Sequence, residues 1–267
     1  MHWNFAFNAA QTIWMLTFAA QLVLLVVLLG RDRARLFPLF TLCTVLVTFR
    51  WLASRLLFQR LSPVAGNLLF LSLAVLVALA NLAFVTELAL KTFKNASRKT
   101  KLIGGGVVLI LAVTMVVVWG PWPGWKTFTG SGLLVALRMM QLVAQRGDML
   151  TSGLAVELAI LAAFVGRSLG AGWRSHRQLL LIGAGTLGAC ELAISGIWQA
   201  IATHTIPHTQ DEYFRLLGLR DKLNNANSAI YIVVLIWWLV CLWIDEPGAA
   251  DALPASAESA PAPTPES

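Results

Sequence analysis

Charged residues are scarce in this chain. Asp, Glu, Lys and Arg make up 12% of its 267 residues, while 58% are hydrophobic and the mean hydropathy is +0.73. An ordinary soluble domain carries roughly 25% charged residues. So little charge excludes a water-soluble globular protein, because water could not solvate its surface. Lipid is therefore the expected solvent for most of the chain.

Cysteines, catalytic motifs and an early basic segment are also lacking. The three cysteines, Cys43, Cys190 and Cys241, fall within apolar stretches, which excludes a disulfide framework and an iron–sulfur ligand set. Neither GxSxG nor HExxH occurs, so we expect no enzymatic activity and no cofactor. Met1–Asn8 contains no Lys or Arg, which a cleaved secretion signal would need. The first apolar stretch is expected to stay in the membrane.

Seven apolar stretches are each long enough to cross a bilayer, which takes about 20 residues of helix. They cover Ala9–Leu29, Phe37–Phe58, Leu68–Leu90, Leu102–Trp119, Leu150–Leu169, Leu179–Ile201 and Ala229–Ile244. Strands of a membrane barrel would instead alternate in polarity over about 10 residues. The sequence predicts an all-α polytopic membrane helix bundle with seven transmembrane helices over residues 1–246. A disordered acidic tail rich in Ala and Pro is expected over residues 247–267.

Basic residues gather in three connections between the predicted spans. These are Arg31, Arg33 and Arg35, then Lys91, Lys94, Arg98, Lys99 and Lys101, then Arg167, Arg174 and Arg177. Since Lys and Arg concentrate in cytoplasmic loops, we expect the amino terminus outside and the tail in the cytoplasm. Bases beside span ends favour anionic lipid as a partner, beyond the lipid bilayer itself, and do not indicate nucleic acid. A cytoplasmic or membrane protein is the other partner considered.

Two outer segments are more polar than the spans. Ser131–Arg146 has the pattern of an amphipathic helix, which could lie in the outer interface or run on through Gly147 and Asp148 into the fifth span. We favour the interface. Ala202–Ser228 is predicted to be a long polar connection, helical over Tyr213–Lys222 and broken by three asparagines before the last span.

Three ionisable residues lie deep within predicted spans, where an unpaired charge costs at least about 2.5–3.5 kcal/mol. Arg50, Glu157 and Glu191 are each about 12 or 13 residues from the cytoplasmic end of their span. At about 1.5 Å per residue all three reach nearly the same depth, close to the midplane. We therefore predict that they form one ligand or proton site.

Two carboxyls facing one guanidinium leave a surplus negative charge, so a dry site is expected to hold one proton or one cation. Ser195 lies one turn from Glu191 on the same helical face and joins the predicted site. The alternative is a structural ion pair that locks three helices together, with the second Glu protonated and hydrogen-bonded to backbone or to Ser195.

Two motifs need a structural interpretation. Gly183–Gly188 matches the dinucleotide fingerprint GxGxxG, but inside a span its small residues indicate close helix packing rather than a cofactor site. His204, His208 and Asp211 gather in an outer connection and are weak candidates for a metal site, which we do not predict, because Pro207 interrupts the helix that would align the two histidines.

Short motifs in the last hundred residues carry a resemblance. They are Leu169–His176, the Gly-rich opening of the sixth span with Glu191, Tyr231–Trp237 and Asp245–Pro247. In them the chain resembles uncharacterised bacterial seven-span integral membrane proteins, which implies a multi-pass protein of the bacterial inner membrane. The topology is also similar to rhodopsin-like and SWEET-like proteins. However, Ala229–Ile244 lacks the Lys that would hold retinal, and the Pro-Gln signature of SWEET proteins is missing.

These observations give two functional hypotheses. The first is a non-enzymatic sensor or accessory module without an output domain of its own, because the cytoplasmic tail is too short to be one. The second is a proton-coupled small-solute transporter that uses the midplane cluster of Arg50, Glu157 and Glu191.

Overall fold

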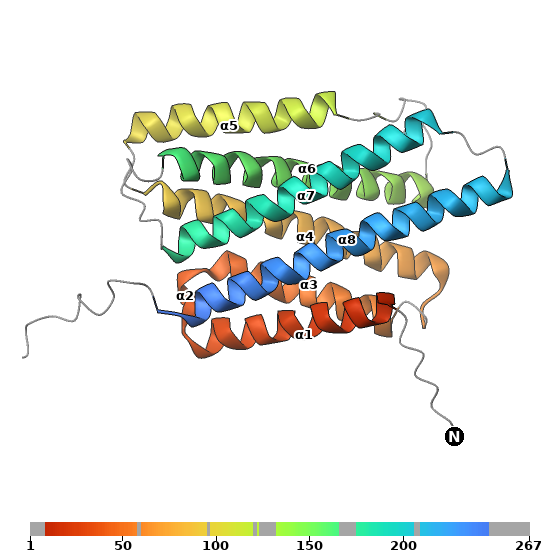
Figure 1. Ribbon diagram of the computed structural model, residues 1–267, viewed down its shortest axis with the longest axis horizontal. Helices are drawn as coiled ribbons and strands as arrows, with labels where there is room; N and C mark the ends of the chain where they lie inside the picture. Colours follow the sequence, from red (N-terminus) through yellow and green to blue (C-terminus); the bar gives the residue numbers. More distant parts are fainter. Residues whose placement is uncertain are drawn as a thin grey trace, which may run out of the picture.

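The structure is a computed structural model, and it describes residues 9–57, 60–94, 97–119, 122, 132–165, 175–205 and 209–245. Within these residues the chain is helical, and seven helices are long and apolar enough to cross a membrane. The seven are α1 (Ala9–Gly30), α3 (Pro38–Leu56), α4 (Pro63–Thr92), α5 (Arg98–Val118), α6 (Leu133–Val165), α7 (His176–His204) and α8 (Gln210–Trp243) (Figure 1). A single-turn helix, α2 (Arg33–Leu36), joins α1 to α3. The predicted all-α, seven-span membrane fold is confirmed.

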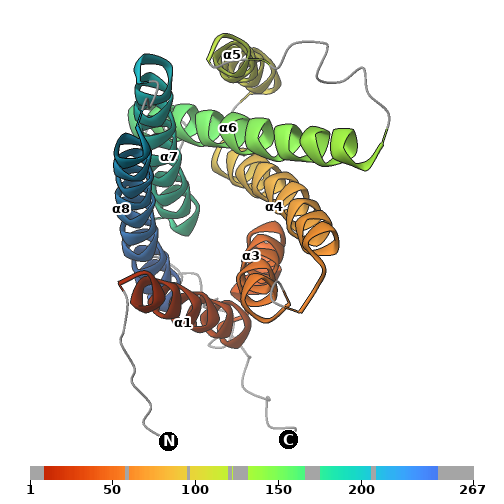
Figure 2. The ribbon, with the colours of Figure 1, turned by 90° about the vertical axis from the view of Figure 1, so that its right-hand side faces the viewer.

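Six of the long helices form a closed ring, which the end-on view of Figure 2 shows plainly. Each helix packs on the next in the order α1, α3, α4, α6, α7, α8, and α8 returns to α1. The ring explains the burial pattern: Leu24, Phe40, Leu88 and Leu235 are among the fully buried side chains and belong to four different helices. A ring of this kind has an interior that side chains must fill or leave hollow.

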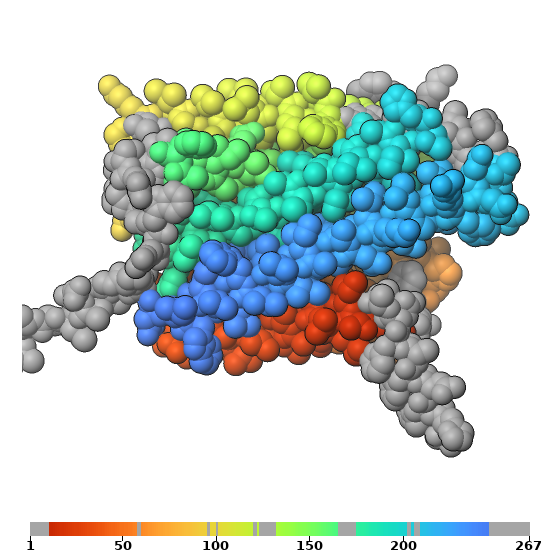
Figure 3. Space-filling model, in the orientation of Figure 1, coloured from red at the N-terminus to blue at the C-terminus, as the bar shows by residue number. Residues whose placement is uncertain are grey.

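Helix α5 stands outside the ring and packs on α6 (Figure 2). Most of its apolar side chains are exposed, including Leu102, Ile110 and Val118. A side chain added at Gly104, Gly105 or Gly106 would meet no atom within 4 Å. Lipid is the medium that would cover such a surface in a membrane. In the space-filling view of Figure 3, α5 lies along one edge of the molecule, while α7 and α8 cover the face shown.

The amphipathic segment Ser131–Arg146 is not a separate helix in the interface, and our preference for that arrangement was wrong. Helix α6 runs without a break from Leu133 to Val165. Gly147 lies within this helix, and its lack of a side chain lets α6 approach α4. A Cβ added there would lie 3.2 Å from Cβ of Ala78. Thr151 also donates a 2.8 Å hydrogen bond to the Gly147 carbonyl oxygen within the same helix.

The helix predicted over Tyr213–Lys222 is confirmed, but the predicted break at the three asparagines is wrong. Helix α8 begins at Gln210 and continues through all three asparagines to Trp243. A capping box starts it, in which Thr209 and Glu212 each accept a hydrogen bond from the other's backbone N–H. Because the helix start is fixed this firmly and no proline follows, the asparagines continue the helix.

The Gly-rich motif of α7 makes close helix packing, as predicted. A Cβ added to Gly183 would lie 2.2 Å from Nε1 of Trp238 on α8. On the α6 side, one added to Gly188 would lie 2.6 Å from the Ser152 carbonyl oxygen. Only glycine permits these approaches, and they hold α7 against both of its neighbours in the ring.

Two polar groups at the basic end of the bundle serve as helix caps. Glu87 on α4 accepts hydrogen bonds from the backbone N–H of Leu39 (3.0 Å) and Phe40 (3.2 Å) at the start of α3, and pairs with Lys91 at 2.7 Å. His176 is buried, and its Nε2 lies 2.9 Å from the Ile244 carbonyl oxygen after the last turn of α8. Both groups bind unpaired backbone at helix ends.

Candidate functional site

The interior of the ring contains a cavity of about 320 Å³. Side chains from α3, α4, α6, α7 and α8 line it, so every ring helix except α1 contributes. This volume lies at the small end of the range found for ligand pockets, about 300–1,000 Å³. Its size and position make it the candidate functional site.

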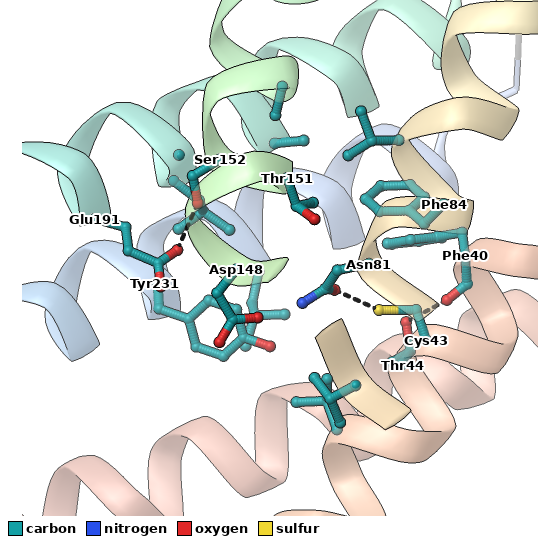
Figure 4. A pocket seen from close by; sticks show the side chains of 18 of the residues that line it. Phe40, Cys43, Thr44, Asn81, Phe84, Asp148, Thr151, Ser152, Glu191 and Tyr231 are labelled. Carbon is teal, nitrogen blue, oxygen red and sulfur yellow. Dashed lines mark hydrogen bonds between the residues drawn. The ribbon is translucent and has the colours of Figure 1, made fainter. Parts of the chain in front are cut away.

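The cavity lining has two chemically different ends. Figure 4 shows Asp148 and Glu191 at one end and Phe40 and Phe84 at the other. The polar and charged lining residues are Thr44, Arg50, Asn81, Asp148, Thr151, Ser152, Glu191, Asn227 and Tyr231, and the aromatic ones besides Tyr231 are Phe40, Trp51, Phe84 and Trp238. A molecule filling the cavity would have one polar and one apolar part.

Three aromatic rings close the apolar end. The Phe40 ring lies 4.8 Å from that of Phe84 and 5.2 Å from that of Trp238, measured between centroids. Phe84 and Trp238 meet edge to face at 6.1 Å. The indole N–H of Trp238 is fixed by a 3.2 Å hydrogen bond to the Leu180 carbonyl oxygen. We call Phe40, Phe84 and Trp238 the aromatic plug, because their rings pack together at the apolar end of the cavity.

The charged end combines one base with two acids. Arg50, Asp148 and Glu191 all line the cavity, and the charge of Asp148 interacts with those of both other residues. Within the described part of the chain, no hydrogen bond or ion pair joins Arg50 to either acid. The Arg50 guanidinium instead lies over the Phe70 ring, 4.8 Å from its centroid. Asp148 is therefore close enough to Arg50 to be influenced by its charge without being neutralised by direct contact.

Asp148 and Glu191 differ in their partners. The Glu191 carboxylate accepts a 2.8 Å hydrogen bond from the Ser152 hydroxyl, one helical turn along α6 from Asp148. Glu191 lines the cavity and is itself an exposed residue of α7. Asp148 makes no direct hydrogen bond to any other described residue. Its carboxylate therefore has no direct hydrogen-bond partner among the described residues of the cavity lining.

Neutral groups around the acids are held in defined orientations. Tyr231 accepts a 3.0 Å hydrogen bond from the Gln21 side chain of α1, which leaves its own O–H as a donor. The Cys43 thiol donates to Oδ1 of Asn81 at 2.8 Å. Asn81 is thus a polar contact between α3 and α4, and Figure 4 shows its amide nitrogen turned toward Asp148.

The structure brings together two of the predicted site residues, Arg50 and Glu191, and places the others elsewhere. Glu157 does not line the cavity. It follows Asp148 by nine residues, which at about 100° per residue puts the two on opposite faces of α6. Its Oε2 is buried and accepts no hydrogen bond from the described residues. Ser195 is exposed and outside the cavity lining, and Ser152 rather than Ser195 is the partner of Glu191.

Asp148 and Asn227 were missed because of where the sequence analysis placed helix boundaries, and Tyr231 was missed although it lies inside the predicted last span. Asp148 was assigned to the edge of a span, and Asn227 to a helix-breaking loop. The signal was present in α6: Asp148, Ser152 and Ala155 are spaced by four and three residues, which is the spacing of one helical face.

The weak metal candidates do not form a site in the described residues. His204 ends α7 and Asp211 lies in the first turn of α8, while His208 lies outside the described residues. No group of three or more His, Cys, Asp and Glu in the described ranges is arranged to hold a metal ion. Gly166 and Gly170, and the predicted tail at 247–267, also lie outside these ranges.

Comparison with known proteins gives no family assignment: no family model, no curated protein and no solved structure matches this chain.

Proposed function

We propose that this multi-pass membrane protein binds a small solute in the central cavity and moves it across the bilayer together with, or in exchange for, protons. One observation carries the proposal: Asp148 and Glu191 share an interior cavity with Arg50 at the middle of five membrane-spanning helices. Ionisable groups at this depth are costly and usually mark ion or substrate pathways.

Each part of the lining has a role in this proposal. Asp148 and Glu191 take up and release a proton as the solute leaves and enters. Arg50 keeps one of the two acids ionised by its positive charge. The aromatic plug closes the cavity toward the end of the bundle that carries Arg31 and Arg33, which we place in the cytoplasm on the basis of its basic residues. A bacterial inner membrane as the location rests on the sequence resemblance.

The experiment is proton-linked flux in vesicles. The full chain is reconstituted with a pH-sensitive dye inside, and amines, amino acids, carboxylic acids and sugars are added outside in turn. We expect at least one class to change the internal pH, and Asp148→Asn and Glu191→Gln to reduce that signal at least tenfold. Glu157→Gln is the matched control, since it neutralises an acid on the opposite face of α6, and should leave the flux unchanged.

Loss of flux in Glu157→Gln together with full flux in Asp148→Asn would move the site out of the cavity. Absence of flux for every class would exclude transport of these solutes and favour a second candidate, a non-enzymatic sensor or accessory module.

The sensor candidate is supported by the path from the cavity to the basic end of the bundle. Helix α8 lines the cavity with Tyr231 and Trp238, and just beyond its last turn Asp245 pairs with Arg33 at 2.8 Å and with Arg31 at 3.4 Å. A shift of α8 on ligand binding would therefore change an exposed charged surface that a partner protein could recognise. The same vesicles discriminate the two roles, because a sensor binds its ligand without flux.

A further inference from the structure

The balance of charge around the cavity indicates which class of solute it accepts. Two carboxylates and one guanidinium contribute a net charge of minus one when all three are ionised. In a low-dielectric site this imbalance favours the uptake of one positive charge. A zwitterion would leave the net charge of minus one unchanged, and an anion would make it more negative.

The apolar part of the lining limits the form of that positive charge. Phe40, Phe84 and Trp238 occupy one end, and the Trp51 and Tyr231 rings also border the cavity. Aromatic faces attract organic cations and bind apolar groups. A bare metal ion would leave this surface unused, and the described residues provide no cluster of metal ligands. A cation with an apolar body would contact both the acidic end and the aromatic end of the cavity.

We propose that the cavity binds a small monovalent organic ammonium ion, with its nitrogen at Asp148 and Glu191 and its apolar body against the aromatic plug. This inference rests on the proposed function, because it names the substrate class of the same site. The ammonium ion and a proton compete for the same surplus negative charge. Binding of the cation therefore releases a proton from the acid that held it, and the positive charge within the site is conserved.

Several side chains from the helices around Asp148 could compete with it for the proton. They are Arg50 and the Cys43 thiol on α3, Glu191 on α7 and Tyr231 on α8, while α4 contributes the neutral amide of Asn81. Of these, Glu191 is the other carboxyl, and so the other group that can hold the exchanged proton while Arg50 keeps its positive charge. The exchange therefore involves one proton, shared by Asp148 and Glu191.

The test uses four compounds that share a phenyl ring on a short carbon chain and differ in charge. They are phenethylamine (cation), phenylalanine (zwitterion), 2-phenylethanol (neutral) and phenylacetate (anion). Binding to the purified full chain in lipid nanodiscs is measured by calorimetry. We expect phenethylamine to bind at least tenfold more tightly than each of the others. Repetition in two buffers of different ionisation enthalpy should show release of up to one proton, and the affinity should increase with pH by at most tenfold per unit.

Variants then assign the binding to the acids. Asp148→Asn and Glu191→Gln should each weaken phenethylamine binding at least tenfold and abolish proton release, while Glu157→Gln should leave both unchanged. If one variant does not fold, the other together with proton release decides the result.

Tighter binding of phenylalanine, phenylethanol or phenylacetate would overturn the ammonium assignment but leave a solute site in the cavity. Phenethylamine affinity that stays within twofold in both acid variants, or binding without proton release, would also overturn it. Failure of all four compounds to bind would end this inference, whereas the proposed transport function is judged separately by proton flux with the wider solute panel.

Discussion

The hydroxyl of Ser152 on α6 donates a 2.8 Å hydrogen bond to the carboxylate of Glu191 on α7. One turn earlier on α7, Gly188 faces the backbone of this same Ser152, since an added Cβ would lie 2.6 Å from its carbonyl oxygen. The close approach of the two helices and the orientation of the cavity acid thus both involve Ser152.

Replacement of Ser152 by alanine tests whether its hydroxyl orients the Glu191 carboxylate. Ser152→Ala removes the hydrogen bond that the Ser152 hydroxyl donates to Glu191, worth about 0.5–1.5 kcal/mol. We expect the midpoint of proton-linked flux to shift along the pH axis, with a loss of at most about tenfold in rate. Ser228→Ala is the control, because its hydroxyl bonds to the Asn224 carbonyl oxygen within α8. An unchanged pH profile in Ser152→Ala would mean that the hydrogen bond does not tune Glu191.

Addition of a methyl group at Gly188 tests helix packing. Gly188→Ala forces the backbones of α6 and α7 apart, which typically costs about 1–3 kcal/mol. Thermal unfolding in detergent should show a lower midpoint. Gly218→Ala on α8 is the matched control, since an added Cβ there meets no atom within 4 Å and alanine favours helix by about 1 kcal/mol. Equal midpoints for the two variants would contradict the close approach.

Removal of the Glu87 side chain tests the cap of α3. Glu87→Ala leaves the N–H groups of Leu39 and Phe40 without their acceptor and Lys91 without its ion-pair partner. We expect a loss of about 1–3 kcal/mol in the free energy of unfolding. Glu87→Gln keeps an acceptor of the same size and should lose less. Greater damage from Gln than from Ala would show that the acid does not cap the helix.

The ion pairs of Asp245 should contribute little to stability. The Asp245 side chain is 73% exposed, and exposed pairs contribute about 0–1 kcal/mol. Asp245→Asn should therefore lower the unfolding midpoint slightly at low ionic strength, and the difference should disappear in about 1 M salt, where charges are screened beyond about 3 Å. A large loss that persists in high salt would point to a role of Asp245 beyond its pairing with Arg31 and Arg33.

Helix ends and polar residues near them were the hardest features to predict from the sequence. Apolar length located all seven spans, but it assigned Asp148 and Asn227 to connections, because hydropathy marks what lipid surrounds and not where a helix ends. The capping box at Thr209 and the uninterrupted pattern from Leu133 through Gly147 were the signals that extend α8 and α6.

The sequence by itself determined the class of the protein and the number of its spans, since both follow from the cost of placing polar groups in lipid. Only the tertiary structure decided which of the interior charges share a cavity. Depth along a helix is set by residue number, whereas the direction in which a side chain points depends on how each helix is rotated against its neighbours. Asp148 faces Glu191 and Arg50 across the hollow, and Glu157, at a similar expected depth, lies on the other side of its helix.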